Sequence, residues 1–267
     1  MSTATSQTRA TPIQVAGRAA VPVGGLWDRL AHPALPAARF DPSTLTGLPE
    51  AAGRWLAHAI APGTPMYRAV LLEMEGHIRL GRWLPFRAVQ VHAPPDGYVW
   101  AARTRLGPLS ITGYDRYADG VGQMRWRLLG RVPVVNATGP DLDHSAAGRV
   151  ALDACFVPTA LLTLPVTWRA GSNADTAIAE WTVGDHTLRP ELHVGADGAL
   201  RSVAMARWAK PSGHPWGEYP CGGSLHDEAD FGGIKLPTRM RVGYFFGTDE
   251  WAEGEFFRAR ITSATFL

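Results

Sequence analysis

Cysteine is scarce in this chain of 267 residues, which contains only Cys155 and Cys221. Two cysteines give neither a disulfide framework nor the paired spacing of a zinc site. Long apolar runs are also missing, because no stretch approaches the roughly 18 apolar residues of a membrane span. The 26 basic and 24 acidic residues leave a formal charge of +2, with no basic block. This balance argues against a protein that binds nucleic acid or a membrane surface through its charge.

Motifs of the common enzyme classes are absent too. There is no GxSxG nucleophile elbow, no glycine fingerprint of dinucleotide folds and no phosphate loop. The sequence also has no HxH, HExxH or CxxC pair. His214, His226, Asp227, Glu228 and Asp230 do cluster, but polar loop residues explain this cluster more simply than a metal site. We therefore expect no cofactor and no metal.

The first residues, MSTATSQTRATPIQVAGRAAVPVGGLW, lack the unbroken apolar core of a secretory signal. They contain no acidic residue before Asp28, which gives a faint likeness to a transit peptide, but a flexible tail is the simpler interpretation. We therefore expect residues 1–45 to be flexible or irregular, and the protein to be soluble and cytoplasmic.

From Tyr67 onward, short runs rich in β-branched and aromatic residues alternate with Gly and Pro, which is typical of all-β proteins. Turn signals are Asp-Gly at Asp96, Asp119 and Asp197 and Gly-Asp at Gly184. Their regular spacing favours a meander over Greek-key connections. The expected strands are YRAVLLEMEG, RAVQVHA, GYVWAARTR, LSITGYDRY, GQMRWRLLG, LPVTWRAG, AIAEWTVGD, TLRPELHVG, SVAMARWAK, LPTRMRVGYFF and EFFRARITSATFL.

The segment DRYADGVGQM combines the residue types of a calcium loop with the spacing of a hairpin. A calcium loop needs oxygen ligands at alternate positions over about twelve residues, and here Asp115 and Asp119 stand alone. Asp119-Gly120 tolerates positive φ, and Gly122 would allow a bulge. The sequence therefore predicts a hairpin, with Met124 and Trp126 on one face of the return strand.

Two helices are expected. GLPEAAGRWLAHAIAP fits an amphipathic helix near 49–61. GPDLDHSAAGRVALDACFVP fits a helix near 142–155, with Asp141 or Asp143 as N-cap and Arg149 and Asp153 placed to form an i, i+4 pair. With no internal repeat or linker in view, we expect residues 46–267 to form a single domain.

Several of these segments together resemble a bacterial family of unknown function, DUF6544 (earlier DUF6920). They are RWLPFRAVQ, GYVWAAR, DRYADGVGQM, GRVALDACFVPTALL before VTW, GGIKLPTRM and ITSATFL, in that order. The resemblance runs from about Tyr67 to the C-terminus. It implies a fold similar to LolA and other lipoprotein carriers: a mainly β (α+β) chain whose strongly curved antiparallel sheet, an open half-barrel, cups one or two helices and an apolar cavity.

The chain departs from the family pattern at two positions. Family members usually carry Glu and Trp where this chain has Asp153 and Phe156. Asp153 keeps the carboxylate but shortens its reach. If this acid contacts a ligand, the pocket differs in shape from that of its relatives; if it only pairs with Arg149, the exchange has little effect.

Ten tryptophans suggest an aromatic-lined cavity. For any one of them, a place in the core of the sheet is the simpler interpretation, but together they exceed what a compact core needs. Such a cavity suits an apolar, polycyclic or isoprenoid-like ligand, or a cation held against an indole. Arg103 could bind an acidic head group, although an arginine on the outer face is the safer interpretation. The expected ligand-binding residues are Trp100, Met124, Trp126, Arg103, Tyr114, Trp208 and Tyr244.

Proton chemistry in such a cavity would need a carboxylate whose pKa is shifted by burial. Asp153 is the first candidate, because its helix should lie over the cup, and Asp115 is the second. A plain ion pair of Asp153 with Arg149 remains open, as does an outward orientation of Asp115. Glu180 and His193 are expected to be ordinary strand residues.

Two function hypotheses follow. The first, which we favour at this point, is a cofactor-independent enzyme, an isomerase, cyclase, lyase or hydrolase that acts on an apolar substrate by acid/base chemistry. The second is a non-catalytic carrier or sensor of a lipid-like molecule. A third, a partner-binding scaffold, would require an exposed apolar patch. The expected partner is an apolar small molecule, with no nucleic acid and no insertion into a membrane.

Overall fold

The computed structural model describes residues 21–34 and 37–267. Within them, one antiparallel sheet holds the strands in the order β6-β5-β4-β3-β2-β1-β14-β13-β12-β11-β10-β8-β7, with β9 paired to β8. The bounds are β1 (Val70–Leu80), β2 (Arg82–Ala93), β3 (Gly97–Leu106), β4 (Leu109–Ala118), β5 (Val121–Leu128), β6 (Val132–Ala137), β7 (Thr167–Ala170), β8 (Thr176–Val183), β9 (His186–Leu188), β10 (Glu191–Val194), β11 (Leu200–Ala209), β12 (Gly217–Asp230), β13 (Lys235–Tyr244) and β14 (Glu255–Phe266).

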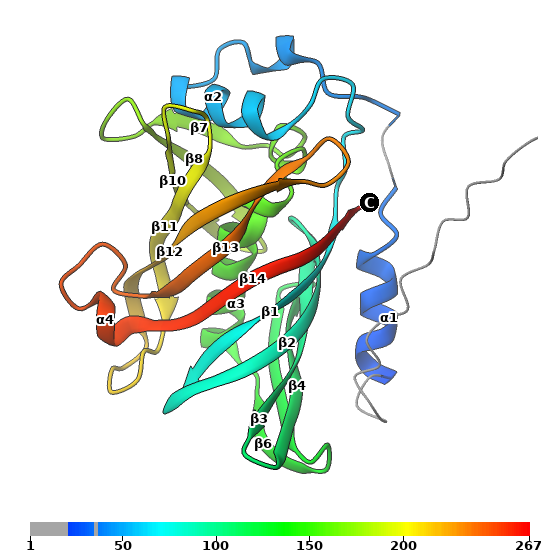
Figure 1. Ribbon diagram of the computed structural model, residues 1–267, viewed down its shortest axis with the longest axis vertical. Coiled ribbons are helices and arrows are strands. Elements are labelled where there is room, and N and C mark those ends of the chain that lie inside the picture. The colour runs from blue at the N-terminus through cyan, green and yellow to red at the C-terminus, as the bar shows by residue number, and fades with distance from the viewer. Residues whose placement is uncertain (1–20, 35–36) are drawn as a thin grey trace, which may run out of the picture.

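The sheet consists of two meanders, which join where the first strand of the chain, β1, pairs with the last, β14. Strands β1 to β6 follow one another in space, and β14 returns to pair with β1 over Val70–Ile78. The predicted meander is thus confirmed within each half. The sheet remains open in the described residues, with β6 and β7 at its edges. It curves strongly (Figure 1), and register shifts in the β1–β14, β5–β6, β10–β11 and β13–β14 pairs supply the local bends that such curvature needs.

The helices occupy three different places around the sheet. Helix α3 (Pro140–Asp153) connects β6 to the second half and lies inside the curve, against β5 and β11. Helix α2 (Glu50–Ala59) lies over one end, near β8 and β10 (Figure 1). Helix α1 (Val21–Leu30) packs on the outer face, where Leu26 and Leu30 join the cluster of Val91 and Val99. A short helix, α4 (Trp251–Gly254), precedes β14. The fold class expected from the sequence is therefore confirmed: a curved antiparallel sheet around one enclosed helix.

Four details differ from the sequence predictions. Strand β12 was expected to be a polar loop, because Pro220 and the glycines of the segment are typical of loops. In the structure its first part pairs with β11, and its residues from Cys221 onward pair with β13. Strand β6 was not predicted. Helix α3 begins at Pro140 with Gly139 as N-cap, not Asp141 or Asp143, because proline suits the first helical position. The expectation of an irregular segment over 1–45 is wrong for Val21–Leu30, which is helix α1; residues 1–20 and 35–36 lie outside the described residues.

The predicted β4–β5 hairpin is confirmed, but its glycines act differently from the prediction. Asp119 and Gly120 have φ of 54° and 79° and make the tight turn. Gly122 forms no bulge, since the β4–β5 register is regular. Helix α3 instead passes so close that a Cβ on Gly122 would lie 2.7 Å from the Leu142 carbonyl oxygen and 2.9 Å from Ala146 Cβ.

We therefore expect Gly122→Ala to destabilise the fold by about 1–3 kcal/mol, because the helix must move away from the sheet. Urea unfolding measures the change. Gly53→Ala is the matched control: it lies within α2, its added methyl meets nothing within 4 Å, and it should raise stability by up to about 1 kcal/mol through helix propensity. Equal effects of the two substitutions would contradict the close packing of α3 on β5.

Candidate functional site

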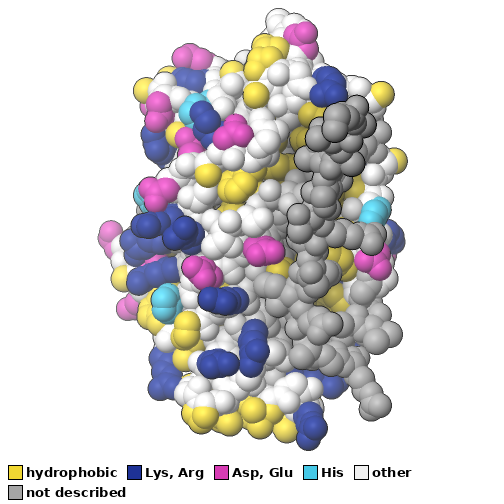
Figure 2. Space-filling view, turned by 45° about the vertical axis from the view of Figure 1, so that its right-hand side comes forward, with side chains coloured by type: hydrophobic (Ala, Val, Ile, Leu, Met, Phe, Trp, Pro, Cys, Tyr) yellow, Lys and Arg dark blue, Asp and Glu magenta, His cyan; other side chains and the backbone are white. Residues whose placement is uncertain are grey.

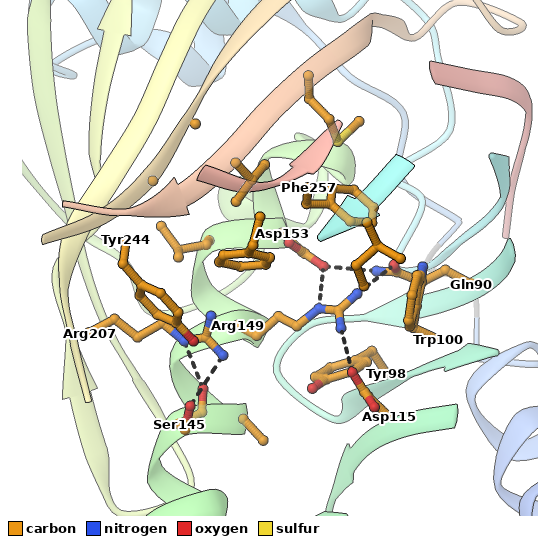
Figure 3. Close-up of a pocket in the computed structure, with 18 of the residues that line it drawn as sticks. Gln90, Tyr98, Trp100, Asp115, Ser145, Arg149, Asp153, Arg207, Tyr244 and Phe257 are labelled. Atoms are coloured by element: carbon orange, nitrogen blue, oxygen red, sulfur yellow. Dashed lines mark hydrogen bonds and ion pairs between the residues drawn. The ribbon is translucent and has the colours of Figure 1, made fainter. Parts of the chain in front are cut away.

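The inside of the curve is not filled by α3. A cavity of about 550 Å³ lies between this helix, strands β1 to β5 and strands β11 to β14. Most of its lining is apolar, with Met74, Phe156, Leu225, Met240 and Phe257 among the side chains. Among its lining residues, Leu80, which is 52 % exposed, and Lys210 are exposed to solvent. Figure 3 shows two arginines, Arg149 and Arg207, that extend into this space from α3 and β11.

Arg149 is the centre of a network that ties α3 to the sheet (Figure 3). Its Nε donates to Asp153 Oδ2 at 3.3 Å, its Nη2 donates to Gln90 Oε1 at 3.2 Å, and its Nη1 lies 3.6 Å from Asp115 Oδ2. Gln90 Nε2 also donates to Asp153 Oδ2 at 2.9 Å. The guanidinium lies over the Tyr98 ring, 4.6 Å from its centroid. One partly buried cation thus holds two carboxylates and an aromatic face in place.

Arg207 has a different environment. Its Nε donates to the Ser145 carbonyl oxygen at 3.0 Å and its Nη2 to Ser145 Oγ at 3.3 Å, while Nη1 lies 3.9 Å from the Cys221 thiol. Among the described residues, no carboxylate lies within 4.0 Å of this guanidinium. Arginine keeps its charge even when buried. The cavity therefore contains a cation that only neutral groups contact.

The cationic excess extends over the whole lining. Four cationic and two acidic residues with side chains not turned to the outer face line the cavity, an excess of two positive charges: Arg79, Arg149, Arg207 and Lys210 against Asp115 and Asp153. Arg116 also lines the cavity, but its guanidinium donates to Gln123, next to Tyr114 on the outer face. Both carboxylates lie at Arg149. An anion inside the cavity would therefore be attracted toward Arg207 and not toward Arg149.

Five of the residues that the sequence singles out line this cavity. Asp115 and Asp153 meet at Arg149, and Trp100, Met124 and Tyr244 form parts of the wall. Trp126 lies behind the lining: its Nε1 donates to Asp115 Oδ1 at 2.8 Å and its ring is 5.7 Å from that of Trp100. The ion pair between Arg149 and Asp153 is present, inside the cup and not on the surface.

Three others lie elsewhere. Tyr114 is on the outer face beneath α1, where its hydroxyl donates to Gln123. Arg103 is exposed on the outer face and donates to Ser110 Oγ. Trp208 stacks on His144 and donates to Asp141 at the start of α3. Because side chains alternate along a strand, Tyr114 and Arg103 point away from the cavity that their neighbours Asp115 and Ala102 face.

Gln90, Ser145 and Arg207 are not among the residues predicted from the sequence. A signal was present for two of them, since Gln90 falls in phase with Phe86 and Ala88 on β2, and Arg207 with Val203 and Met205 on β11. A polar residue at an inward position of an apolar strand face needs a partner or a function. Ser145 gives no such signal, because its role depends on where α3 lies.

Burial shifts the titration of several groups around the network. It raises the pKa of Asp115 against the opposing effects of Arg149 and of the hydrogen bond from Trp126. It also lowers the pKa of His92 to about 4, despite the nearby Asp153 carboxylate. Neither ring nitrogen of His92 has a hydrogen-bond partner. At neutral pH, His92 is therefore an uncharged residue of the wall behind Arg149.

The described residues offer no group of three or more His, Cys, Asp or Glu side chains that could hold a metal ion. The polar cluster on β12 is dispersed into pairs: Asp227 with Arg239 and Glu228 with His58. Both cysteines are buried free thiols. Among the described residues, no helix is both long enough and apolar enough to span a membrane.

Residues 38–256 match the family of unknown function DUF6544. The chain belongs to this family. Comparison with curated proteins gives no significant match. Among solved structures, a LolA superfamily protein from Nitrosomonas europaea is 10 % identical, with 86 % of this chain and 94 % of that chain covered and a TM-score of 0.43. A domain described as an outer-membrane lipoprotein-sorting protein from Vibrio parahaemolyticus is 9 % identical, with 74 % and 85 % covered and a TM-score of 0.32.

Arg149→Met should destabilise the protein by about 2–3 kcal/mol, because it leaves two partly buried carboxylates without their cation. The free energy of unfolding in urea measures this loss. The triple variant Arg149→Met/Asp115→Asn/Asp153→Asn removes the stranded charges as well, and should recover more than half of the loss. A triple variant that is no more stable than Arg149→Met would show that the helix needs the arginine for another reason.

His92 should make stability depend on pH below neutrality. Its folded pKa of about 4 lies below the ordinary histidine pKa of 6.5, so the unfolded chain binds the proton first as pH falls. Its contribution is present above pH 6.5 and is lost progressively toward pH 4, by up to about 3 kcal/mol. His92→Leu should flatten this part of the stability–pH curve, whereas His77→Leu, at an exposed position, should leave it parallel to the wild type. Parallel curves for all three proteins would contradict the burial of His92.

Proposed function

We propose that the protein binds an elongated apolar molecule with an anionic head group inside the cup, and carries it without changing it. The observation that supports this most directly is Arg207, a cation in an apolar cavity with no carboxylate within 4.0 Å among the described residues. Burying a charge without a counter-charge is costly. A ligand anion at Arg207 would supply the missing partner.

The size and lining of the cavity favour the same ligand class. A volume of about 550 Å³ lies within the range of small-molecule sites. Phe257 stacks on Phe86 beside Trp100, and Met74 and Met240 add flexible apolar surface. The apolar part of the ligand would lie along this wall, and its head group would contact Arg207, with Ser145 and Tyr244 next to it (Figure 3).

Carriage is favoured over catalysis because the two candidate acids are already engaged. Asp153 accepts from Arg149 and from Gln90. Asp115 accepts from Trp126 and lies against Arg149. A general base must reach a substrate proton through a free lone pair, and these contacts already engage Asp153 Oδ2 and both carboxylate oxygens of Asp115.

A cofactor-independent enzyme is the second candidate, and one observation favours it. Burial raises the pKa of Asp115, which lines the cavity, and a raised carboxyl pKa is common in general acids and bases. Native mass spectrometry followed by solvent extraction identifies whatever molecule co-purifies. Unaltered ligand after long incubation supports carriage, whereas conversion that is lost in Asp115→Asn or Asp153→Asn supports catalysis.

Arg207→Gln should weaken binding of a fluorescent long-chain fatty acid by about 10- to 100-fold, the effect of losing one charge-assisted hydrogen bond. Binding of the corresponding fluorescent alcohol should change little. Fluorescence titration measures both affinities. Arg201→Gln, on the same strand but paired with Asp197 at the surface, is the matched control and should bind both probes as the wild type does.

Equal losses for acid and alcohol in Arg207→Gln would mean that the arginine supports the fold and not the head group. A wild type that binds neither probe would contradict the proposed ligand class. Val203→Trp, which fills the cavity from β11, should abolish binding of both probes and so shows whether they enter the cup.

A further inference from the structure

Exposed aliphatic side chains gather at one end of strands β1 to β6, where three hairpin turns lie. Among the described residues, eight large apolar side chains are exposed, and seven of these lie in three hairpins. The most exposed are Leu129 at 56 %, Val132 at 55 % and Leu80 at 52 %. Leu80 is in the β1–β2 turn, Leu106 and Leu109 flank the β3–β4 turn, and Leu129, Val132, Val134 and Val135 belong to the β5–β6 hairpin.

The meander places these three hairpin turns side by side. Strands β1 to β6 lie side by side in the order of the sequence. Every second turn is therefore at the same end of the strands, roughly 10 Å from the next. The register keeps them level: Leu106 pairs with Leu109, and the Leu129 N–H donates to the Ser110 carbonyl oxygen at 2.7 Å. This end of the strands is the lower end of the molecule in Figure 1. Figure 2 shows apolar side chains there, next to Lys and Arg side chains.

The charged side chains within these three hairpins have one sign. Residues 76–87, 102–112 and 125–137 contain no Asp or Glu, but they contain eight arginines: Arg79, Arg82, Arg87, Arg103, Arg105, Arg125, Arg127 and Arg131. Arg82, Arg105 and Arg131 are exposed beside the apolar residues, and among the described residues none of them has a carboxylate within 4.0 Å. The even charge of the whole chain conceals this cluster, which forms only when the hairpins align.

We propose that these three turns form a docking surface for membranes that contain anionic lipids. Aliphatic side chains at the turns would enter the boundary between head groups and acyl chains, and the arginines would bind lipid phosphates. A second copy of the chain fits less well, because two such surfaces would bring arginines together without carboxylates. Pro133 on the edge strand β6 also limits strand pairing with another chain.

The position of the cavity agrees with this surface. Ile78, Arg79 and Leu80 line the cavity and also lead into the β1–β2 turn. Leu80, an exposed residue of the cavity wall, therefore lies at the same end of the strands as the docking surface. Docking does not require the cup to hold a ligand, so this surface can be tested separately from the proposed function.

The test is sedimentation of the full chain with vesicles of phosphatidylcholine alone and with vesicles in which about a third of the lipid is phosphatidylglycerol. The wild type should bind the anionic vesicles at least about tenfold more tightly, and added salt should weaken this binding. Leu80→Ser/Leu129→Ser/Val132→Ser and Arg82→Gln/Arg105→Gln/Arg131→Gln should each reduce binding at least about tenfold. All these positions are exposed, so circular dichroism and melting temperature should stay near the wild-type values.

Two controls match these variants. Val121→Ser changes the eighth exposed aliphatic residue, which lies at the β4–β5 turn, at the opposite end of these strands. This variant should bind as the wild type does. Arg169→Gln/Arg189→Gln/Arg201→Gln removes the same charge from exposed positions on the other half of the sheet and should also retain binding. The proposal is overturned if the wild type ignores anionic vesicles, if the turn and control variants bind alike, or if the turn substitutions only dissociate a dimer.

Discussion

Arg149 carries a positive charge from α3 into the inside of the sheet, and the arrangement of the cup depends on how that charge is neutralised. Asp153 on the same helix, Asp115 on β4 and Gln90 on β2 converge on one guanidinium. A buried ion network of this kind adds little net stability, but it permits only one position of its members. It fixes the helix against β2 and β4, while Gly122 lets the start of the helix contact β5 directly. The space that remains toward β12, β13 and β14 is the cavity.

The two arginines of the cup therefore have different roles. Arg149 is satisfied by the protein itself, since both carboxylates of the cavity lie beside it. Arg207 is held in place by Ser145 and by the thiol of Cys221, neither of which carries a negative charge when protonated. Burial raises the pKa of that thiol, partly offset by Arg207, so the thiolate does not serve as counter-ion at neutral pH. The different environments of the two arginines thus follow from where the carboxylates are, and the proposed ligand anion would complete only that of Arg207.

The sequence predicts the architecture better than the site. Alternating strands and Asp-Gly turns identify the meander, and the i, i+4 spacing identifies the Arg149–Asp153 pair. Strand β12 is not predicted because Pro220 and the glycines near it are typical of a loop. Helix α1 is not predicted because its glycines weaken the helical pattern. Tyr114 and Arg103 were assigned to the cavity although they face outward, because the sequence does not say which face of a strand lies inside a curved sheet. Arg207 depends on contacts between β11 and α3, which are distant in sequence.

A cavity of this size persists only if the surrounding elements cannot collapse into it. Apolar walls without a ligand lose dispersion contacts, so the empty cup is less stable than a filled core would be. Collapse would have to draw α3 toward β13 and β14, which would pull Arg149 from Asp115 and Gln90 and expose buried charge. The network therefore opposes closure of the cavity, and a ligand would restore the missing contacts and raise stability by mass action. Stability given up at the centre of a fold in this way is characteristic of sites retained for binding.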